Sequence, residues 1–189
     1  MSQAVVDTRA VEKRRRILQA AWRLVLRYGL RSATMEGLAR EAGIAKGTLY
    51  AQFADKDAVV AAVIDDMLVE LDAAFRQGMA GGGLAAERIG AALAGKYGVI
   101  ARALEGSPHA DEIFGEHYRF ATRFAAFDRG VEDEIVAELA KAGAANAATL
   151  AHIVIGAANG VAHRLPGATA IESAIRLLCR RIIEPDIET

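Results

Sequence analysis

The sequence has a single cysteine, three prolines, few aromatic residues and no long hydrophobic run. One cysteine, Cys179, excludes an intrachain disulfide and a thiolate zinc site, and we expect it to be a buried, small apolar side chain. The longest apolar stretch, residues 153–162, contains Asn159 and falls well short of the roughly 20 residues that span a bilayer. The first thirty residues are basic but have no apolar run, so no signal peptide is indicated. We therefore expect a cytoplasmic protein without a membrane partner.

The charge of the chain is unevenly distributed, although the net charge is only −1. Residues 1–60 hold eleven Lys and Arg against six Asp and Glu, whereas residues 61–189 hold twelve against eighteen. The basic amino-terminal third is either an ordinary solvated surface or the footprint of a polyanion such as nucleic acid. At 189 residues, of which 53% are hydrophobic, the chain can bury a core.

Apolar residues recur at spacings of three and four along the whole chain, and no period-two stretch of useful length appears. The predicted fold class is therefore all-α, with nine helices. The expected helices cover about residues 9–28, 34–42, 45–52, 55–75, 89–104, 108–127, 128–143, 146–165 and 169–185. Their predicted starts include the capping residues Thr34, Asp55 and Asp128 and a capping box at Thr169–Glu172.

Consecutive glycines in "GMAGGG", residues 78–83, form the best linker in the sequence, because glycines break helices and flex. We place the domain boundary there. The predicted organisation is an amino-terminal domain of three helices over residues 1–56, a connecting helix over 56–77, and a second helical domain over 78–189.

The expected short helices 34–42 and 45–52 are joined by a tight turn at Gly43, within "EAGIAKGTLYAQFADKD", residues 41–57. This arrangement, braced by a longer helix on each side, is a helix-turn-helix unit. In such units the second helix enters the DNA major groove, and residues near its amino end meet base edges. Gly47 lies in the first turn of that helix, where the lack of a side chain allows close approach to a surface.

The exposed residues of this unit suit contact with double-stranded DNA. Lys46 and Thr48 are candidate base or phosphate contacts, and Tyr50 can donate its hydroxyl to a phosphate. Thr34 and Lys56 lie at helix starts, where backbone amides favour an anion. The alternatives are that Tyr50 covers the small core and that the two lysines are only solvated.

Residues 14–57, from "RRRILQAAWRLVLRYG" through "SATMEGLAREAGIAKGTLYAQFADKD", resemble the amino-terminal domain of the TetR family of bacterial transcription regulators. The resemblance implies a homodimer that binds a palindromic operator and, most often as a repressor, releases it when a small-molecule effector binds the carboxy-terminal domain. Ala45, where the family often has a capping serine or threonine, and Ala51-Gln52, in place of an aromatic-histidine pair, leave the operator sequence open. The positions that typically contact DNA in the family are here Thr34, Lys46, Gly47, Thr48, Tyr50 and Lys56.

The segment "HIVIGAANGVAHRL" within the expected helix 146–165 is apolar on nearly every side, so this helix should be buried on more than one side. A self-complementary dimer interface formed with the last helix would bury it. The alternative is a central core helix of a monomer. The expected interface residues are Ile153, Gly156, Ala157, Gly160, Ile175, Leu178 and Ile182.

An effector pocket is expected among the fifth to eighth helices, where aromatic side chains are concentrated. Aromatic residues at helical spacing also fit an ordinary core. A mostly apolar ligand would be oriented by the few buried polar groups, for which we expect His117, Asn159 and His163. The aromatic candidates are Tyr97, Phe114, Tyr118, Phe120 and Phe124.

Three other functions fit the sequence less well. His109, Glu112 and Glu116 share a helix face with spacing that suits a divalent metal ion, but no second ligand cluster completes a site. No Gly-x-Ser-x-Gly, Gly-rich phosphate loop or Cys-His pairing is present, so we expect neither an enzyme nor a cofactor. A helical interaction module without DNA binding remains as the runner-up, against which the basic amino-terminal region argues.

Overall fold

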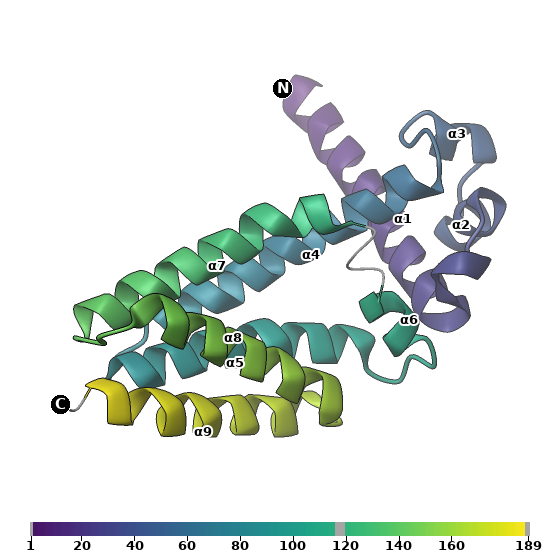
Figure 1. The fold of residues 1–189 in the computed structure, drawn as a ribbon. Helices are drawn as coiled ribbons and strands as arrows, with labels where there is room; N and C mark the ends of the chain where they lie inside the picture. Colours follow the sequence, from purple (N-terminus) through teal and green to yellow (C-terminus); the bar gives the residue numbers. More distant parts are fainter. Residues whose placement is uncertain (1, 116–119, 188–189) are drawn as a thin grey trace. The chain divides into compact units, whose positions relative to one another are not determined.

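A computed structural model describes residues 2–115 and 120–187, and in these ranges it contains nine α-helices and no strand (Figure 1). The predicted all-α fold class is confirmed. The helices are α1 (Ser2–Ser32), α2 (Met35–Ala42), α3 (Lys46–Tyr50), α4 (Lys56–Met79), α5 (Ala85–Leu104), α6 (Ala110–Gly115), α7 (Ala121–Lys141), α8 (Ala147–Arg164) and α9 (Ala168–Ile187).

The chain forms two compact units. Unit 1 comprises Met1–Met67 with Gly106–Ala121, and unit 2 comprises Leu68–Glu105 with Thr122–Thr189. The units therefore divide within α4, and α6 belongs with the first three helices. These compact units differ from the functional domains predicted from the sequence. The predicted domain boundary at residues 78–83 remains a prediction.

Unit 1 has its own apolar core, formed by one face of α1 together with α2, α3 and the first half of α4. Ile17, Leu49 and Val59 are almost completely buried, which fits the predicted small core of the helix-turn-helix unit. Ile113 of α6 packs against the same core. Residues more than forty positions beyond the motif thus complete the hydrophobic packing of unit 1.

The turns of unit 1 follow the expected capping chemistry. The Thr34 hydroxyl accepts a hydrogen bond from the Gly37 amide at 3.1 Å, which satisfies a free donor at the start of α2. Gly43 adopts the left-handed conformation, φ 65°, directly after α2. Asp55 accepts from the Ala58 amide at 2.8 Å, as a cap of α4. These three predictions are confirmed.

Unit 2 is built around α5, which packs against α9 and α8. Its core includes the fully buried Leu93, Ile135, Ile175 and Cys179. Burial raises the pKa of the Cys179 thiol to about 12, so this residue is the inert apolar side chain that we expected.

Lys96 is a charged residue buried beside this apolar core, and its side chain is only 9% exposed. Its ammonium lies 3.3 Å from an Asp128 carboxylate oxygen and near the rings of Tyr97 and Phe127. Burial lowers the pKa of Lys96, although the Asp128 carboxylate acts in the opposite direction.

Several helix boundaries differ from the prediction. Asp128 lies inside α7 rather than at its start, because α7 begins at Ala121. Thr169 lies inside α9, and Glu172 forms an ion pair with Arg102 instead of closing a capping box. The last helix also continues through Pro185. Gly29 breaks α1 as expected, with φ 78°, but one more helical turn follows it.

Candidate nucleic-acid interface

Helix α3 presents its polar residues outward and one apolar residue inward. Leu49 is fully buried, whereas Tyr50 is 44% exposed, and Lys46 and Gly47 are also exposed. No atom lies within 4 Å of the position that a Cβ of Gly47 would occupy, apart from its own helix and neighbours. The backbone at the start of α3 is therefore open to a flat partner such as a DNA backbone or base edge.

Lys46 is held by neighbours within unit 1. Its ammonium forms an ion pair with the Glu36 carboxylate on α2 and lies 5.6 Å from the centre of the Tyr50 ring. This hydrogen bond raises the pKa of Lys46 and lowers that of Glu36. A contact between Lys46 and DNA would therefore require Lys46 to exchange Glu36 for a phosphate or base. Glu36 is a functional neighbour that the sequence pattern did not single out, although an acidic residue in the first turn of α2 was a signal.

Thr34 and Lys56 both have structural partners as well as exposed surface. Thr34 is exposed while its hydroxyl caps α2. Lys56 is half-buried, and its ammonium donates to the Leu30 carbonyl at 3.1 Å. Thr48 is half-buried on α3. The structure thus brings Thr34, Lys46, Gly47, Thr48, Tyr50 and Lys56 together in unit 1, and their contacts with DNA remain a prediction.

The predicted dimer residues divide into two groups. On α8, Ile153 is 52% exposed, and Gly156 and Gly160 are exposed, with no atom within 4 Å of an added Cβ at either glycine. On α9, Ile175 is fully buried in the core of its own unit, so its side chain does not lie on the exposed surface of that helix. Leu177, which we did not select, is 53% exposed instead. Ala157, Leu178 and Ile182 are half-buried.

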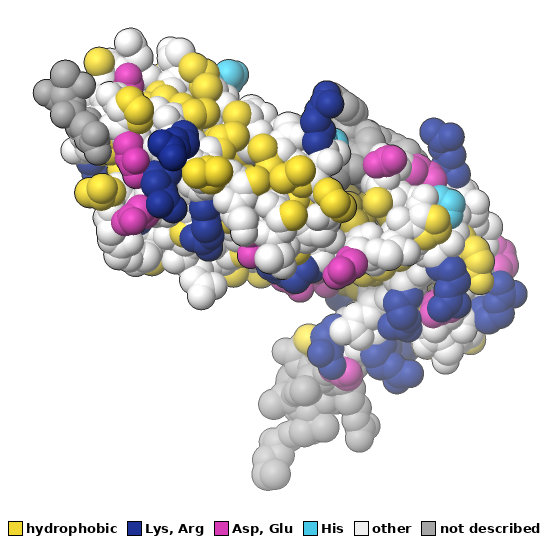
Figure 2. Space-filling model, turned by 90° about the horizontal axis from the view of Figure 1, so that it is seen from below, with side chains coloured by type: hydrophobic (Ala, Val, Ile, Leu, Met, Phe, Trp, Pro, Cys, Tyr) yellow, Lys and Arg dark blue, Asp and Glu magenta, His cyan; other side chains and the backbone are white. Residues whose placement is uncertain are grey.

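Hydrophobic side chains gather in a band on the face of unit 2 shown in Figure 2. The exposed large apolar residues of α8 and α9 are Ile153 and Leu177. The alternative of a central core helix in a monomer is therefore wrong, because one side of α8 remains open to solvent in the single chain, and burial of that side in a dimer remains a prediction.

The predicted effector residues are not assembled into a pocket by the described part of the chain. Asn159 and His163 are exposed rather than buried, because both point away from the core of unit 2. Tyr97 is buried in unit 2, while Phe120 packs against the core of unit 1, and Phe124 is half-buried on α7. His117, Tyr118 and the side chain of Phe114 lie outside the described residues.

A hollow of about 420 Å³ exists elsewhere in unit 2, between the ends of α5, α7 and α9. Arg88, Glu138, Lys141 and Glu184 line it together with Ile187. None of the predicted effector residues contributes to its lining. The effector pocket therefore remains a prediction.

His109 and Glu112, two of the three residues suggested for a metal ion, do lie together, with 3.4 Å between His109 Nδ1 and Glu112 Oε2. Glu116, the third, lies outside the described residues. Within residues 2–115 and 120–187, no group of three or more His, Cys, Asp or Glu side chains is arranged to hold a metal. In the same ranges, no helix combines the length and apolar composition that a bilayer span requires.

The geometry defines a helix-turn-helix protein whose second short helix is open to a partner. Residues 17–63 match the family described as "Bacterial regulatory proteins, tetR family". The amino-terminal part of the chain thus carries the TetR-family domain, and the predicted resemblance is confirmed. No curated protein matches the chain significantly in sequence.

Solved structures extend the likeness to the whole fold. The fatty acid degradation regulator FadR from Bacillus halodurans is 13% identical, with a TM-score of 0.65 over 91% of this chain and 95% of that one. A TetR/AcrR-family regulator from Thermobifida fusca is 20% identical, with 0.67 over 92% and 97%. The TetR-family regulator PfmR from Thermus thermophilus is 18% identical, with 0.67 over 89% and 94%. The chain therefore has the overall fold of these transcriptional regulators.

Proposed function

We propose that this protein is a sequence-specific DNA-binding transcriptional regulator. The observation that carries the proposal is the outward face of α3 in a TetR-family domain, where Lys46, Gly47 and Tyr50 are exposed around the buried Leu49. In this role α3 enters the major groove, and Lys46 and Thr48 meet base edges. Thr34, Tyr50 and Lys56 contact phosphates, and Gly47 allows the backbone to approach.

The regulator acts as a homodimer that places two such domains on a palindromic operator. The exposed Ile153 and Leu177 support this assembly, as do the open surfaces at Gly156 and Gly160, where another backbone can approach closely. A self-complementary patch of this kind closes with two-fold symmetry. Two-fold symmetry in the protein predicts two-fold symmetry in the operator.

The mode of regulation is repression that ends when a small-molecule effector binds unit 2. Such an effector must bind the DNA-free conformation more tightly than the DNA-bound one, or it shifts nothing. Screening compounds for thermal stabilisation and for operator release tests this part separately from DNA binding. A compound that stabilises the protein but leaves operator affinity unchanged is not such an effector.

Selection from a pool of random duplex DNA tests the central proposal. We expect enrichment of a palindrome-like sequence whose affinity falls steeply with salt, because phosphate contacts dominate binding. Gel-shift titration of the enriched duplex against a scrambled one measures the specificity. Failure to enrich any sequence at low salt, with a folded protein, contradicts the proposal.

A further inference from the structure

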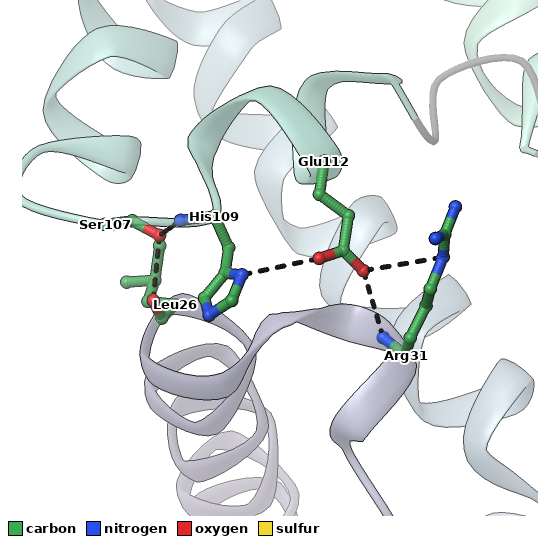
Figure 3. Close-up of polar contacts among 5 residues, drawn as sticks. All are labelled: Leu26, Arg31, Ser107, His109 and Glu112. Carbon is green, nitrogen blue, oxygen red and sulfur yellow. Dashed lines mark hydrogen bonds and ion pairs between the residues drawn. The ribbon is translucent and has the colours of Figure 1, made fainter.

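The short segment that follows α5 is fastened to the end of α1 (Figure 3). The Ser107 hydroxyl donates to the Leu26 carbonyl at 2.8 Å and accepts from the His109 amide at 3.1 Å. Both partners of Ser107 are backbone groups, so the hydroxyl joins the last turn before the break in α1 to the first residues of this segment.

Glu112 of α6 makes the second connection to α1. One carboxylate oxygen accepts from the backbone amide of Arg31 at 3.2 Å, and the other lies 3.4 Å from His109 Nδ1. The carboxylate is partly buried, with 25% of the side chain exposed. The non-helical conformation of Gly29 interrupts the helical ladder just before this point, and Glu112 supplies an acceptor for an amide beyond the break.

Gly29 suits this contact chiefly through its backbone conformation. Its φ of 78° is one that side chains other than glycine rarely adopt. A Cβ at this position would also lie 2.6 Å from Glu112 Oε2 and 3.0 Å from His109 Nδ1. The break in α1 thus favours glycine, and a larger residue there would also make the Glu112 and His109 side chains shift.

The peptide group between Leu30 and Arg31 is held from both ends. Its carbonyl oxygen accepts from the Lys56 ammonium of α4, and its N–H donates to the Glu112 carboxylate of α6. A cation on the oxygen and an anion on the N–H both complement the dipole of this peptide, and hydrogen bonds to charged groups are the stronger kind. Three residues further on, Thr34 caps α2 and begins the helix-turn-helix motif.

The ion pair between the Arg31 and Glu112 side chains is a weaker explanation for this contact. The Arg31 side chain is 86% exposed, and its Nε lies 4.0 Å from the carboxylate. Exposed pairs of this kind contribute little. The backbone amide, rather than the guanidinium, is therefore the important partner of Glu112.

We propose that Glu112 and Lys56 form a clamp on the Leu30–Arg31 peptide that positions Thr34 and α2 for DNA binding. Glu112 is thus a positioning residue of the helix-turn-helix unit, although it lies outside residues 1–56 and touches no DNA. This inference rests on the proposed function for its effect on DNA binding, but the clamp itself can be tested without DNA.

Amide hydrogen exchange of the DNA-free protein tests the clamp directly. In Glu112→Ala we expect the Arg31 amide and its neighbours up to α2 to exchange about tenfold faster, since a hydrogen bond to a charged group contributes about that factor. Glu112→Gln keeps an acceptor oxygen and should restore part of the protection. Arg31→Ala keeps the backbone amide and should exchange like the wild type.

Asp111→Ala is the matched control, because Asp111 is an exposed carboxylate on the same helix. Equal exchange in Glu112→Ala and wild type overturns the clamp. Accelerated exchange in Arg31→Ala as large as in Glu112→Ala also overturns it, because the side-chain ion pair would then be the important contact.

The duplex enriched by the wild-type protein tests the consequence for DNA. Glu112→Ala should bind it about tenfold more weakly, Glu112→Gln should lie between, and Asp111→Ala should bind like the wild type. The slope of affinity against salt should stay unchanged in Glu112→Ala, because no phosphate contact is lost. If the wild type enriches no duplex, the proposed function fails while hydrogen exchange still decides the clamp. Undiminished affinity in Glu112→Ala removes the positioning role.

Discussion

Unit 1 and unit 2 bury their apolar helix faces in the same way but expose different side chains. Unit 1 leaves Lys46, Gly47 and Tyr50 exposed on a helix of five residues, with Leu49 as its only buried residue. Unit 2 leaves Ile153 and Leu177 exposed on helices of 18 and 20 residues. A polar, partly charged face suits the proposed anionic DNA partner, whereas the exposed aliphatic side chains fit the proposed dimer contact.

One glycine in each unit shows a similar difference between an open surface and a packed one. Gly47 in unit 1 faces open space, and the proposed approach of DNA would explain its cost to the helix. Gly78 in unit 2 faces the backbone of α5, so its partner is already present. Gly47 is thus open where a partner is proposed, whereas Gly78 is already packed, and four experiments test the comparison of the two units.

The largest effect is expected on α9, where neighbouring residues face opposite ways. Ile175→Ala should lower the free energy of unfolding by about 2–5 kcal/mol, because it opens a cavity in the core of unit 2. Leu177→Ala should change the stability of the monomer by less than about 1 kcal/mol and weaken self-association instead. Urea denaturation and sedimentation at several concentrations measure the two effects. Similar unfolding losses in both variants contradict the assignment of faces.

A slightly smaller loss is expected from Gly78→Ala. An added Cβ would overlap backbone atoms of Ala91 and Ala92, so α4 and α5 must separate. We expect a loss of about 3 kcal/mol, at the upper end of overpacking effects. Gly82→Ala is the control, since its added Cβ meets nothing within 4 Å. Thermal unfolding followed by circular dichroism measures both, and an unchanged midpoint in Gly78→Ala excludes this tight packing.

Gly47→Ala, unlike Gly78→Ala, should weaken DNA binding without lowering the stability of the protein. The added methyl group meets no neighbour in the chain, and alanine favours a helix by about 1 kcal/mol, so the stability should stay the same or rise slightly. Affinity for the enriched duplex should nevertheless fall about tenfold, a loss of about 1.4 kcal/mol, because the backbone can no longer approach as closely. Gel-shift titration measures the affinity of both proteins for this duplex. An unchanged affinity would show that Gly47 is not part of the DNA interface.

The smallest effect concerns Lys96, the buried cation of unit 2. Burial lowers the pKa of Lys96 in the folded protein below the 10.5 of the unfolded chain. At a pH between the folded and unfolded pKa values, the unfolded chain therefore binds more protons than the folded protein. The stability of the wild type should therefore rise with pH in that window, relative to Lys96→Met. We expect the variant to be about 1 kcal/mol more stable at neutral pH, with an advantage that shrinks towards pH 10.5.

Urea denaturation of the wild type and Lys96→Met across this pH range measures the difference between their free energies of unfolding. Both proteins contain Tyr97 and Cys179, so the ionisation of these two residues cancels in the difference. Lys141→Met, which removes a positive charge from an exposed position, serves as the control. An advantage of Lys96→Met that grows with pH is the opposite sign and refutes the argument.

Much of unit 1 was predictable because its signals are local. Thr34 and Asp55 cap helices whose first turns they precede, and Gly43 takes the left-handed conformation that follows a helix. Such interactions span three or four residues, so spacing alone reveals them. The fully buried Leu49 and the exposed Lys46 follow from the helical period in the same way.

Helix starts in unit 2 were less predictable, because local signals there compete with tertiary contacts. Asp128 has the residue type of a cap but lies inside α7 near Lys96, and Glu172 has the spacing of a capping box but pairs with Arg102. Both carboxylates find a cation on another helix, which no local pattern shows.

The amino-acid sequence by itself determined the all-α class, the helix-turn-helix motif and the polar face of α3, since each depends on residues within a few helical turns. Only the tertiary structure decided which side of α9 is covered and that Glu112 reaches an amide 81 positions away. The physical reason is that periodicity identifies an apolar face without naming its partner, and a hydrogen bond between distant segments leaves no periodic trace.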